Sequence, residues 1–194
     1  MLPWSTDFAG RLDDHFFESE ALKENALGDP HVRPLWVYVP PGYDDEPERR
    51  YSSIYLIQGL TGQLDMWRNR AAFRKNPPEL MDELFASGGA PPAVLVWVDA
   101  WTSLGGSQFL DSPGTGRYHT YLCDEIVPWV DARYRTLADA AHRGIAGKSS
   151  GVENVVIVTS KPFEPAADIS FFAFGRSYFS YFECSSSSEI THGP

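Results

Sequence analysis

Two short apolar runs, each ended by turn-forming residues, constrain the fold of this chain most strongly. Residues 53–57 (Ser-Ile-Tyr-Leu-Ile) lead into Gln58-Gly59, and residues 93–98 (Ala-Val-Leu-Val-Trp-Val) lead into Asp99. Such runs are typical of strands that are buried on both faces of a parallel sheet. Residues 33–39 are rich in β-branched and aromatic side chains and are followed by two prolines and a glycine, so they predict an earlier strand.

The segments between these runs predict the helices that connect parallel strands. Residues 78–85 place apolar side chains at helical intervals, begin with a proline and are followed by Gly88-Gly89. A second helix is predicted from about residue 118 to residue 134, and Pro128 is expected to kink or interrupt it. Residues 143–147 predict a brief strand of small and apolar side chains. Strands that alternate with helices predict an α/β fold with a mostly parallel sheet flanked by helices.

Length and charge limit the number of domains and the class of ligand. A chain of 194 residues that is 43% hydrophobic and 14% aromatic can bury one substantial core, so we expect a single globular domain. The formal charge of −10 would repel phosphate groups, which argues against nucleic acid or an anionic membrane as the main partner. No apolar run reaches the length of a membrane span. A small neutral ligand is compatible with this charge.

Cysteine content and the first residues predict a cytoplasmic protein. Cys123 and Cys184 are too few for a disulfide framework or a four-cysteine zinc site. Residues 1–7 lack the basic region and apolar run of a signal peptide. No histidine shows metal-ligand spacing with another histidine or with a cysteine, so we expect no metal site.

The pentapeptide Gly147-Lys148-Ser149-Ser150-Gly151 fits the G-x-S-x-G pattern of a nucleophile elbow. This sharp strand-to-helix turn needs small flanking residues because the serine backbone is strained and the strand and helix approach closely. The two glycines meet that need, and the motif directly follows the strand predicted at residues 143–147. We therefore interpret Ser149 as a nucleophile and the amide of Ser150 as one donor of an oxyanion hole. A surface turn rich in glycine and serine is the alternative.

A second glycine motif, Gln58-Gly59-Leu60-Thr61-Gly62, follows the strand predicted at residues 53–57. An α/β-hydrolase places the loop that donates the other oxyanion-hole amide after this strand. Glycines in such a loop allow the backbone N–H groups to approach the substrate oxygen. An ordinary glycine turn is the alternative interpretation.

The serine motif also matches the end of a phosphate-binding loop, G-x-x-x-x-G-K-[ST]. The first glycine of that pattern would fall at His142, and Gly144 is too close to the motif to replace it. The motif also follows several predicted strands, whereas a phosphate-binding loop of this kind opens its domain. Nucleotide binding is therefore not favoured.

A serine nucleophile also needs a histidine base and a carboxylate, in the chain order serine, acid, histidine for an α/β-hydrolase. His192 is the histidine downstream of Ser149, and Asp168 lies between them. This pair has the required order. The segments that separate Ser149, Asp168 and His192 are short for the strands and helices that normally bring such groups together at the edge of the sheet. A solvated chain end around His192 is the alternative.

Several blocks in order along the chain resemble the putative-esterase family of α/β-hydrolases, which includes esterase D, S-formylglutathione hydrolase, feruloyl esterases, enterochelin esterases and mycolyltransferases. The blocks are residues 36–43, 54–62, 121–131, 134–136 and 144–151. By position in the family pattern, Ser149 matches the nucleophile, and Leu60 and Ser150 match the residues whose amides hold the oxyanion. Gln58 stands where many relatives have histidine.

The resemblance covers residues 10–151 and implies that residues 1–151 form the N-terminal part of an α/β-hydrolase domain. Residues 152–194 depart from the family pattern, because residues 152–158 favour a strand where relatives have a long helix. We therefore expect a partial α/β-hydrolase fold with a missing or atypical C-terminal part.

The function implied by the resemblance is that of a serine carboxylesterase, which cleaves small-molecule esters or thioesters through an acyl-enzyme on Ser149. This function implies no cofactor. An inactive, truncated hydrolase that acts as a binding protein is one alternative. An acyltransferase of the same family is another, since it would use the same residues with a different acceptor.

Overall fold

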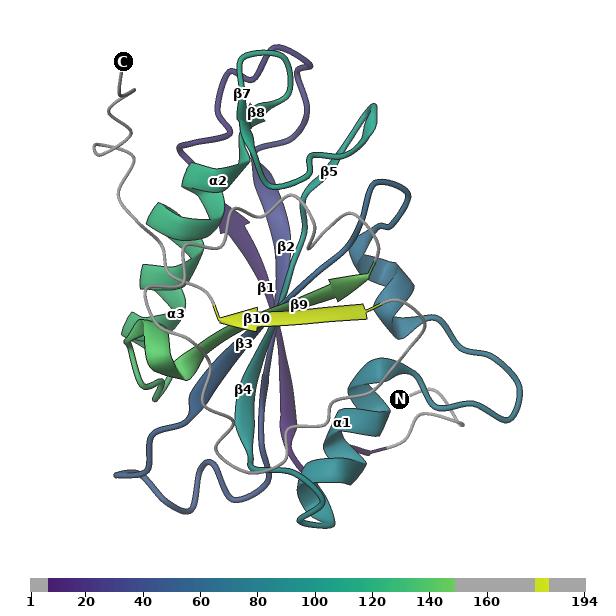
Figure 1. The fold of residues 1–194 in the computed structure, drawn as a ribbon, viewed down its shortest axis with the longest axis vertical. Helices are drawn as coiled ribbons and strands as arrows, with labels where there is room; N and C mark the ends of the chain where they lie inside the picture. Colours follow the sequence, from purple (N-terminus) through teal and green to yellow (C-terminus); the bar gives the residue numbers. More distant parts are fainter. Residues whose placement is uncertain (1–6, 149–176, 182–194) are drawn as a thin grey trace.

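The computed structural model describes residues 7–148 and 177–181, and its centre is a six-stranded sheet (Figure 1). The strands follow one another across the sheet in the order β1-β2-β4-β3-β9-β10. Their bounds are β1 (Arg11–Glu18), β2 (Val32–Val39), β3 (Ser52–Ile57), β4 (Ala93–Val98), β9 (Arg143–Lys148) and β10 (Ser177–Tyr181). The four strands predicted from the sequence correspond to β2, β3, β4 and β9, and their prediction is confirmed.

Strand β3 pairs in parallel with both of its neighbours. Its Tyr55 lies opposite Val96 of β4 and Ile145 of β9. The pairs β1·β2, β2·β4 and β9·β10 are antiparallel. The α/β class is confirmed. The sheet is mixed instead of mostly parallel, because only β4, β3 and β9 pair in parallel among the described strands. A buried apolar run indicates a covered strand but does not by itself fix the direction of its neighbour.

Helices cover both faces of the sheet (Figure 1). Helix α1 (Pro77–Ala86) packs on one face, and a longer helical segment packs on the other. The latter consists of α2 (Tyr118–Thr120), the π-helical turn η2 (Tyr121–Ile126) and α3 (Val127–Arg133). The short 3₁₀ segments are η1 (Leu64–Arg68) and η3 (Ala140–His142). None of the helices in the described part of the chain has the length and apolarity that crossing a bilayer requires.

Two small hairpins lie between β4 and the second helix. Strands β5 (Trp101–Thr102) and β6 (Gly105–Gly106) form the first, and β7 (Asp111–Ser112) and β8 (Gly116–Arg117) form the second. Strands of two residues are too short to show hydropathy periodicity, so the sequence did not predict them. The first hairpin follows the end of β4 directly and becomes part of the candidate site.

Helix α1 begins and ends where its sequence predicts. Asn76 caps the first turn, because its side chain accepts a hydrogen bond from the Glu79 N–H at 3.0 Å and the Glu79 carboxylate accepts one from the Asn76 N–H at 2.9 Å. Prolines occupy the first two positions of the helix, where no N–H is needed. Gly88 has a φ of +72° just after the helix, which a glycine adopts without strain.

The second helix is irregular before Pro128. The Val127 N–H bonds to the Leu122 carbonyl, five residues earlier, which is the spacing of a π-helix. Pro128 has no N–H to continue the regular pattern, and the widened turn accommodates its ring. The prediction that this proline interrupts the helix is confirmed.

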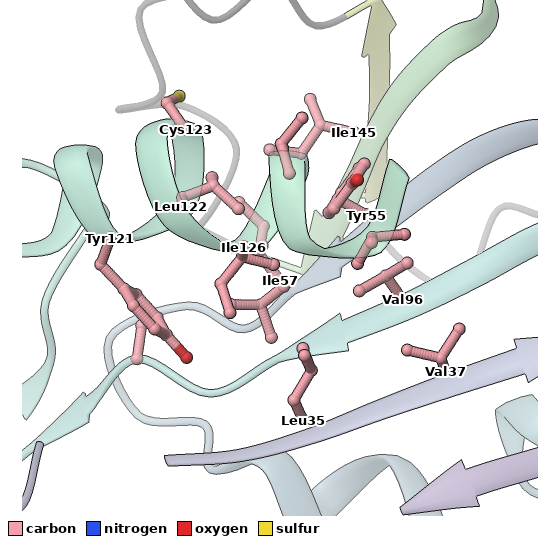
Figure 2. Packing of buried hydrophobic residues seen from close by; sticks show 14 of the residues in the cluster. Leu35, Val37, Tyr55, Ile57, Val96, Tyr121, Leu122, Cys123, Ile126 and Ile145 are labelled. Carbon is pink, nitrogen blue, oxygen red and sulfur yellow. The ribbon is translucent and has the colours of Figure 1, made fainter. Parts of the chain in front are cut away.

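The larger core lies between the sheet and this second helix (Figure 2). Tyr121 and Ile126 of the helix are fully buried, in the same cluster as the sheet residues Val37 and Val96. Neighbouring strand residues point to the opposite face, where Trp36 and others pack under α1. Because both faces are covered, the central strands carry continuous apolar runs.

Replacement of Ile126 by alanine tests this packing. Ile126 is 0% exposed, so the substitution should lower the free energy of unfolding by about 2–5 kcal/mol through lost burial and a residual cavity. Urea denaturation measures this change. Leu104→Ala is the matched control, since Leu104 is 72% exposed and its loss should cost less than about 0.5 kcal/mol. Equal effects of the two substitutions would contradict the packing described.

Candidate functional site

The carboxyl ends of β3, β4 and β9 lie at one edge of the sheet. Ile57 at the end of β3 is opposite Gly147 of β9, and Leu56 is opposite Trp97 of β4. The segments that follow the three strands therefore begin side by side. Ligands of α/β sheets bind beyond this edge, which makes it the candidate functional site.

Of the predicted site residues, the structure describes Leu60. Ser149, Ser150, Asp168 and His192 lie outside the described residues. The strand predicted to lead into the serine motif is confirmed, since β9 extends to the residue immediately before Ser149. The elbow itself and the Asp168–His192 pair stay predictions.

The Leu60 loop is held by backbone hydrogen bonds. The Leu60 carbonyl accepts a hydrogen bond from the Gly106 N–H at 2.7 Å, and the Gly59 carbonyl accepts one from the Gly62 N–H at 3.0 Å. Gly59 is buried, whereas the Leu60 side chain is half exposed. The loop therefore has a fixed backbone and presents an apolar side chain at the sheet edge.

Two glycines of the β5–β6 hairpin allow this close contact. A Cβ atom on Gly106 would lie 2.8 Å from the Gly59 carbonyl oxygen, and one on Gly105 would lie 2.8 Å from the Leu60 carbonyl oxygen. Gly105 also has a φ of +109°, a conformation open mainly to glycine. The adjacent glycines at 105 and 106 were a visible sequence signal of close backbone approach, which the sequence interpretation did not use.

Gln58 joins the end of β3 to the end of β4. Its side chain is buried. The amide is assigned the orientation in which its nitrogen faces a carbonyl and its oxygen faces an N–H, which gives it two hydrogen bonds. The nitrogen donates to the Val98 carbonyl and the oxygen accepts from the Ala100 N–H, both at 2.9 Å. These two partners flank Asp99, so the amide spans the point where the chain leaves β4.

Asp99 is a buried carboxylate directly after β4. An Arg33 Nη1 atom lies 3.4 Å from its Oδ2, and both side chains are less than a tenth exposed. The backbone at Trp101 and Leu64 also favours the ionised carboxylate. Burial raises the pKa of Asp99 to about 6, because desolvation outweighs the opposing effects of the Arg33 charge and the hydrogen bonds. Asp99 thus connects β2, η1 and the hairpin at the site edge.

Arg33 extends this connection to the second helix. Its Nη2 donates to the Trp101 carbonyl and, at 2.5 Å, to the Tyr118 hydroxyl oxygen. Burial raises the pKa of Tyr118, so this hydroxyl stays neutral at physiological pH. The first turn of α2 is therefore fixed to the same polar cluster as the hairpin.

The histidines in the described part of the chain have partners away from the Leu60 loop. The contacts are His15 Nε2 to Tyr134 Oη at 2.6 Å, His31 Nε2 to Glu18 Oε1 at 3.6 Å, His119 Nε2 to Cys123 Sγ at 3.7 Å, and His142 Nδ1 to Asp139 Oδ1 at 2.8 Å. His142 also precedes β9, so six strand residues separate it from Ser149. Within residues 7–148 and 177–181, no three histidine, cysteine, aspartate or glutamate residues are grouped as metal ligands.

Comparison with known families identifies the sequence blocks. The profile of the family described as Putative esterase matches residues 30–162, more than half of the chain. A protein of Xylanibacter ruminicola named endo-1,4-beta-xylanase/feruloyl esterase is 27% identical over 132 residues, covering 65% of this chain and 17% of that protein. An uncharacterized protein of Corynebacterium glutamicum is 24% identical over 120 residues, covering 62% of this chain and 27% of that protein.

Solved structures show the same fold. A ferulic acid esterase superposes with a TM-score of 0.57 at 28% identity, covering 75% of this chain and 51% of that chain. The S-formylglutathione hydrolase of Agrobacterium tumefaciens gives a TM-score of 0.53 at 20% identity, covering 76% of this chain and 52% of that chain. The chain spans about half the length of these structures and a smaller share of the two curated relatives. The predicted resemblance and fold class are confirmed.

The raised pKa of Asp99 predicts a pH-dependent stability. The folded state holds the proton more tightly than the unfolded chain, so the stability from this group is full below about pH 4 and is lost as the pH rises through about 6. The shift from 3.8 to about 6 corresponds to a loss on the order of 3 kcal/mol. Asp99→Asn removes the titration. Urea denaturation measures the unfolding free energy of both proteins at each pH. The value for the original protein minus the value for the variant should decrease as the pH is raised from 4 to 7. A constant or rising difference would contradict the assignment.

Proposed function

Because this chain belongs to the Putative esterase family, we propose that it is a serine carboxylesterase that cleaves esters or thioesters of small molecules. The observation that carries the proposal is the parallel pairing of β3 with β9, which starts the Leu60 loop and the serine motif at one edge of the sheet. This arrangement suits a nucleophile that works beside a backbone oxyanion hole.

In the proposed reaction, Ser149 Oγ attacks the carbonyl carbon of the substrate and gives its proton to a general base. The tetrahedral oxyanion that forms accepts hydrogen bonds from the backbone amides of Leu60 and Ser150. The alcohol or thiol leaves with the proton returned from the base. Water then attacks the acyl-enzyme in the same way, which releases the acid and restores the serine hydroxyl.

The general base of this proposal is His192, with Asp168 as the carboxylate that orients it. Chain order supports the assignment, since both residues follow Ser149 in the sequence that an α/β-hydrolase requires. The histidines in the described part of the chain contact other partners. His192→Ala should therefore remove turnover while leaving the fold intact.

Aromatic and short-chain esters are the first substrates to test. The Xylanibacter protein is named in part as a feruloyl esterase, and the structure with a TM-score of 0.57 is a ferulic acid esterase. The exposed Leu60 side chain beside the proposed oxyanion hole is compatible with an apolar acyl group. Methyl ferulate and p-nitrophenyl acetate together cover these two classes.

Replacement of Ser149 by alanine tests the proposed nucleophile. The chain should hydrolyse p-nitrophenyl acetate and react with a fluorophosphonate probe, and Ser149→Ala should lower turnover by on the order of a thousandfold or more and abolish labelling. Ser87→Ala, on an exposed serine after α1, should change neither readout. Turnover or labelling that survives in Ser149→Ala would contradict the assignment. Labelling without hydrolysis would instead favour transfer of the acyl group to another acceptor.

Replacement of Gly106 by alanine tests the support of the oxyanion loop. The new Cβ would collide with the Gly59 carbonyl and displace the loop, so kcat/KM should fall about ten- to a hundredfold, mainly through kcat. Gly114→Ala is the matched control, since a Cβ there would meet only Ser112 Oγ at 3.6 Å. Steady-state kinetics of both variants measure the effect. Equal activity of the two variants would contradict the proposed role of this contact.

A further inference from the structure

We propose that Gln58 is a positioning residue that fixes the backbone of the Leu60 loop relative to the end of β4. The inference rests on the proposed function, since it assigns to Gln58 the alignment of the oxyanion donor. Gln58 does not itself need to touch the substrate.

The first support is a ring of contacts around Gln58, which is formed by hydrogen bonds and closed by the backbone. Its amide bonds to the Val98 carbonyl and the Ala100 N–H. The Ala100 carbonyl accepts from the Ser107 N–H at 2.9 Å. The neighbouring Gly106 N–H donates to the Leu60 carbonyl at 2.7 Å, two residues beyond Gln58. The ring therefore ties the oxyanion loop, the end of β4 and the hairpin into one unit.

The second support is the chemical demand of the two partners. A backbone carbonyl needs a donor and a backbone N–H needs an acceptor, and a primary amide supplies both from one planar group. Gln58 is 2% exposed, so water does not readily replace it. An apolar side chain of similar length would remove the donor to the Val98 carbonyl and the acceptor for the Ala100 N–H, which is unfavourable for buried polar groups.

The third support is the place of Gln58 in the chain. It is the first residue after β3, and Gly59 separates it from Leu60. Gly59 has no side chain to hold it in place, and its carbonyl oxygen would lie 2.8 Å from a Cβ atom on Gly106. The Gln58 amide is therefore the side-chain anchor nearest to the proposed oxyanion donor on the β3 side.

Two substitutions separate positioning from general stability. Gln58→Met keeps the length and removes both hydrogen bonds, so kcat should fall about ten- to a hundredfold with KM changed less than about threefold. Gln58→Glu restores a donor and an acceptor only when its carboxyl is protonated, and burial raises the pKa of such a group. Activity of Gln58→Glu relative to the original protein, measured at each pH, should therefore rise as the pH falls. Gln63→Glu, on an exposed glutamine five residues away, should show a constant ratio.

Hydrogen exchange gives a readout that does not require turnover. In Gln58→Met, the Ala100 and Gly106 amides should exchange at least about tenfold faster, while the Tyr134 amide, which bonds to the Val130 carbonyl far along the chain, should not change. Faster exchange in these two amides with no turnover in the original protein would contradict the esterase proposal and still support the positioning of the loop. Unchanged exchange, equal acceleration of all three amides, or a flat pH ratio for Gln58→Glu would overturn the positioning role.

Discussion

The parallel pairing of β3 with β4 and β9 is the constraint on which the rest of this structure depends. It sets Ile57 level with Gly147, so β3 and β9 end at the same edge of the sheet. A slip of one residue would turn Tyr55 and Ile57 out of the large core, because successive strand residues face opposite sides. The apolar side chains that stabilise the fold therefore also fix the register that forms the candidate site.

Several features near the candidate site lower the stability of the fold. Asp99 and Arg33 are buried ions, and such pairs often contribute little or less than apolar residues of the same size. Arg33 Nε and the Tyr121 hydroxyl are buried without a hydrogen-bond partner among the described residues. Gln108 and Phe109, which follow the hairpin, both have left-handed φ values, of +62° and +54°. Buried polar atoms without a partner among the described residues also occur at the opposite ends of the strands, at Tyr51 and Arg143.

The sequence predicted the elements whose apolar patterns are long enough to read. Strands β2, β3, β4 and β9, helix α1 and the interruption at Pro128 all follow from runs, helical spacing, capping residues and proline chemistry. It did not predict β1, because Arg11–Glu18 mixes charged and aromatic residues along an edge strand that is only partly buried. The sequence also did not predict the polar cluster of Asp99, Arg33 and Tyr118 at the site edge. Contacts such as Arg33 with Asp99 join residues far apart in the chain, and only the strand order brings them together.

The structure of a covalent adduct with a phosphonate ester would test most directly whether Ser149 and the Leu60 loop form one catalytic site. We predict that phosphorus is bonded to Ser149 Oγ and that the phosphoryl oxygen lies about 2.7–3.1 Å from the backbone nitrogen of Leu60. The Gln58 amide would keep its hydrogen bonds to Val98 and Ala100 in that adduct. Attachment of phosphorus to another residue, or a phosphoryl oxygen directed away from Leu60, would contradict the proposed site.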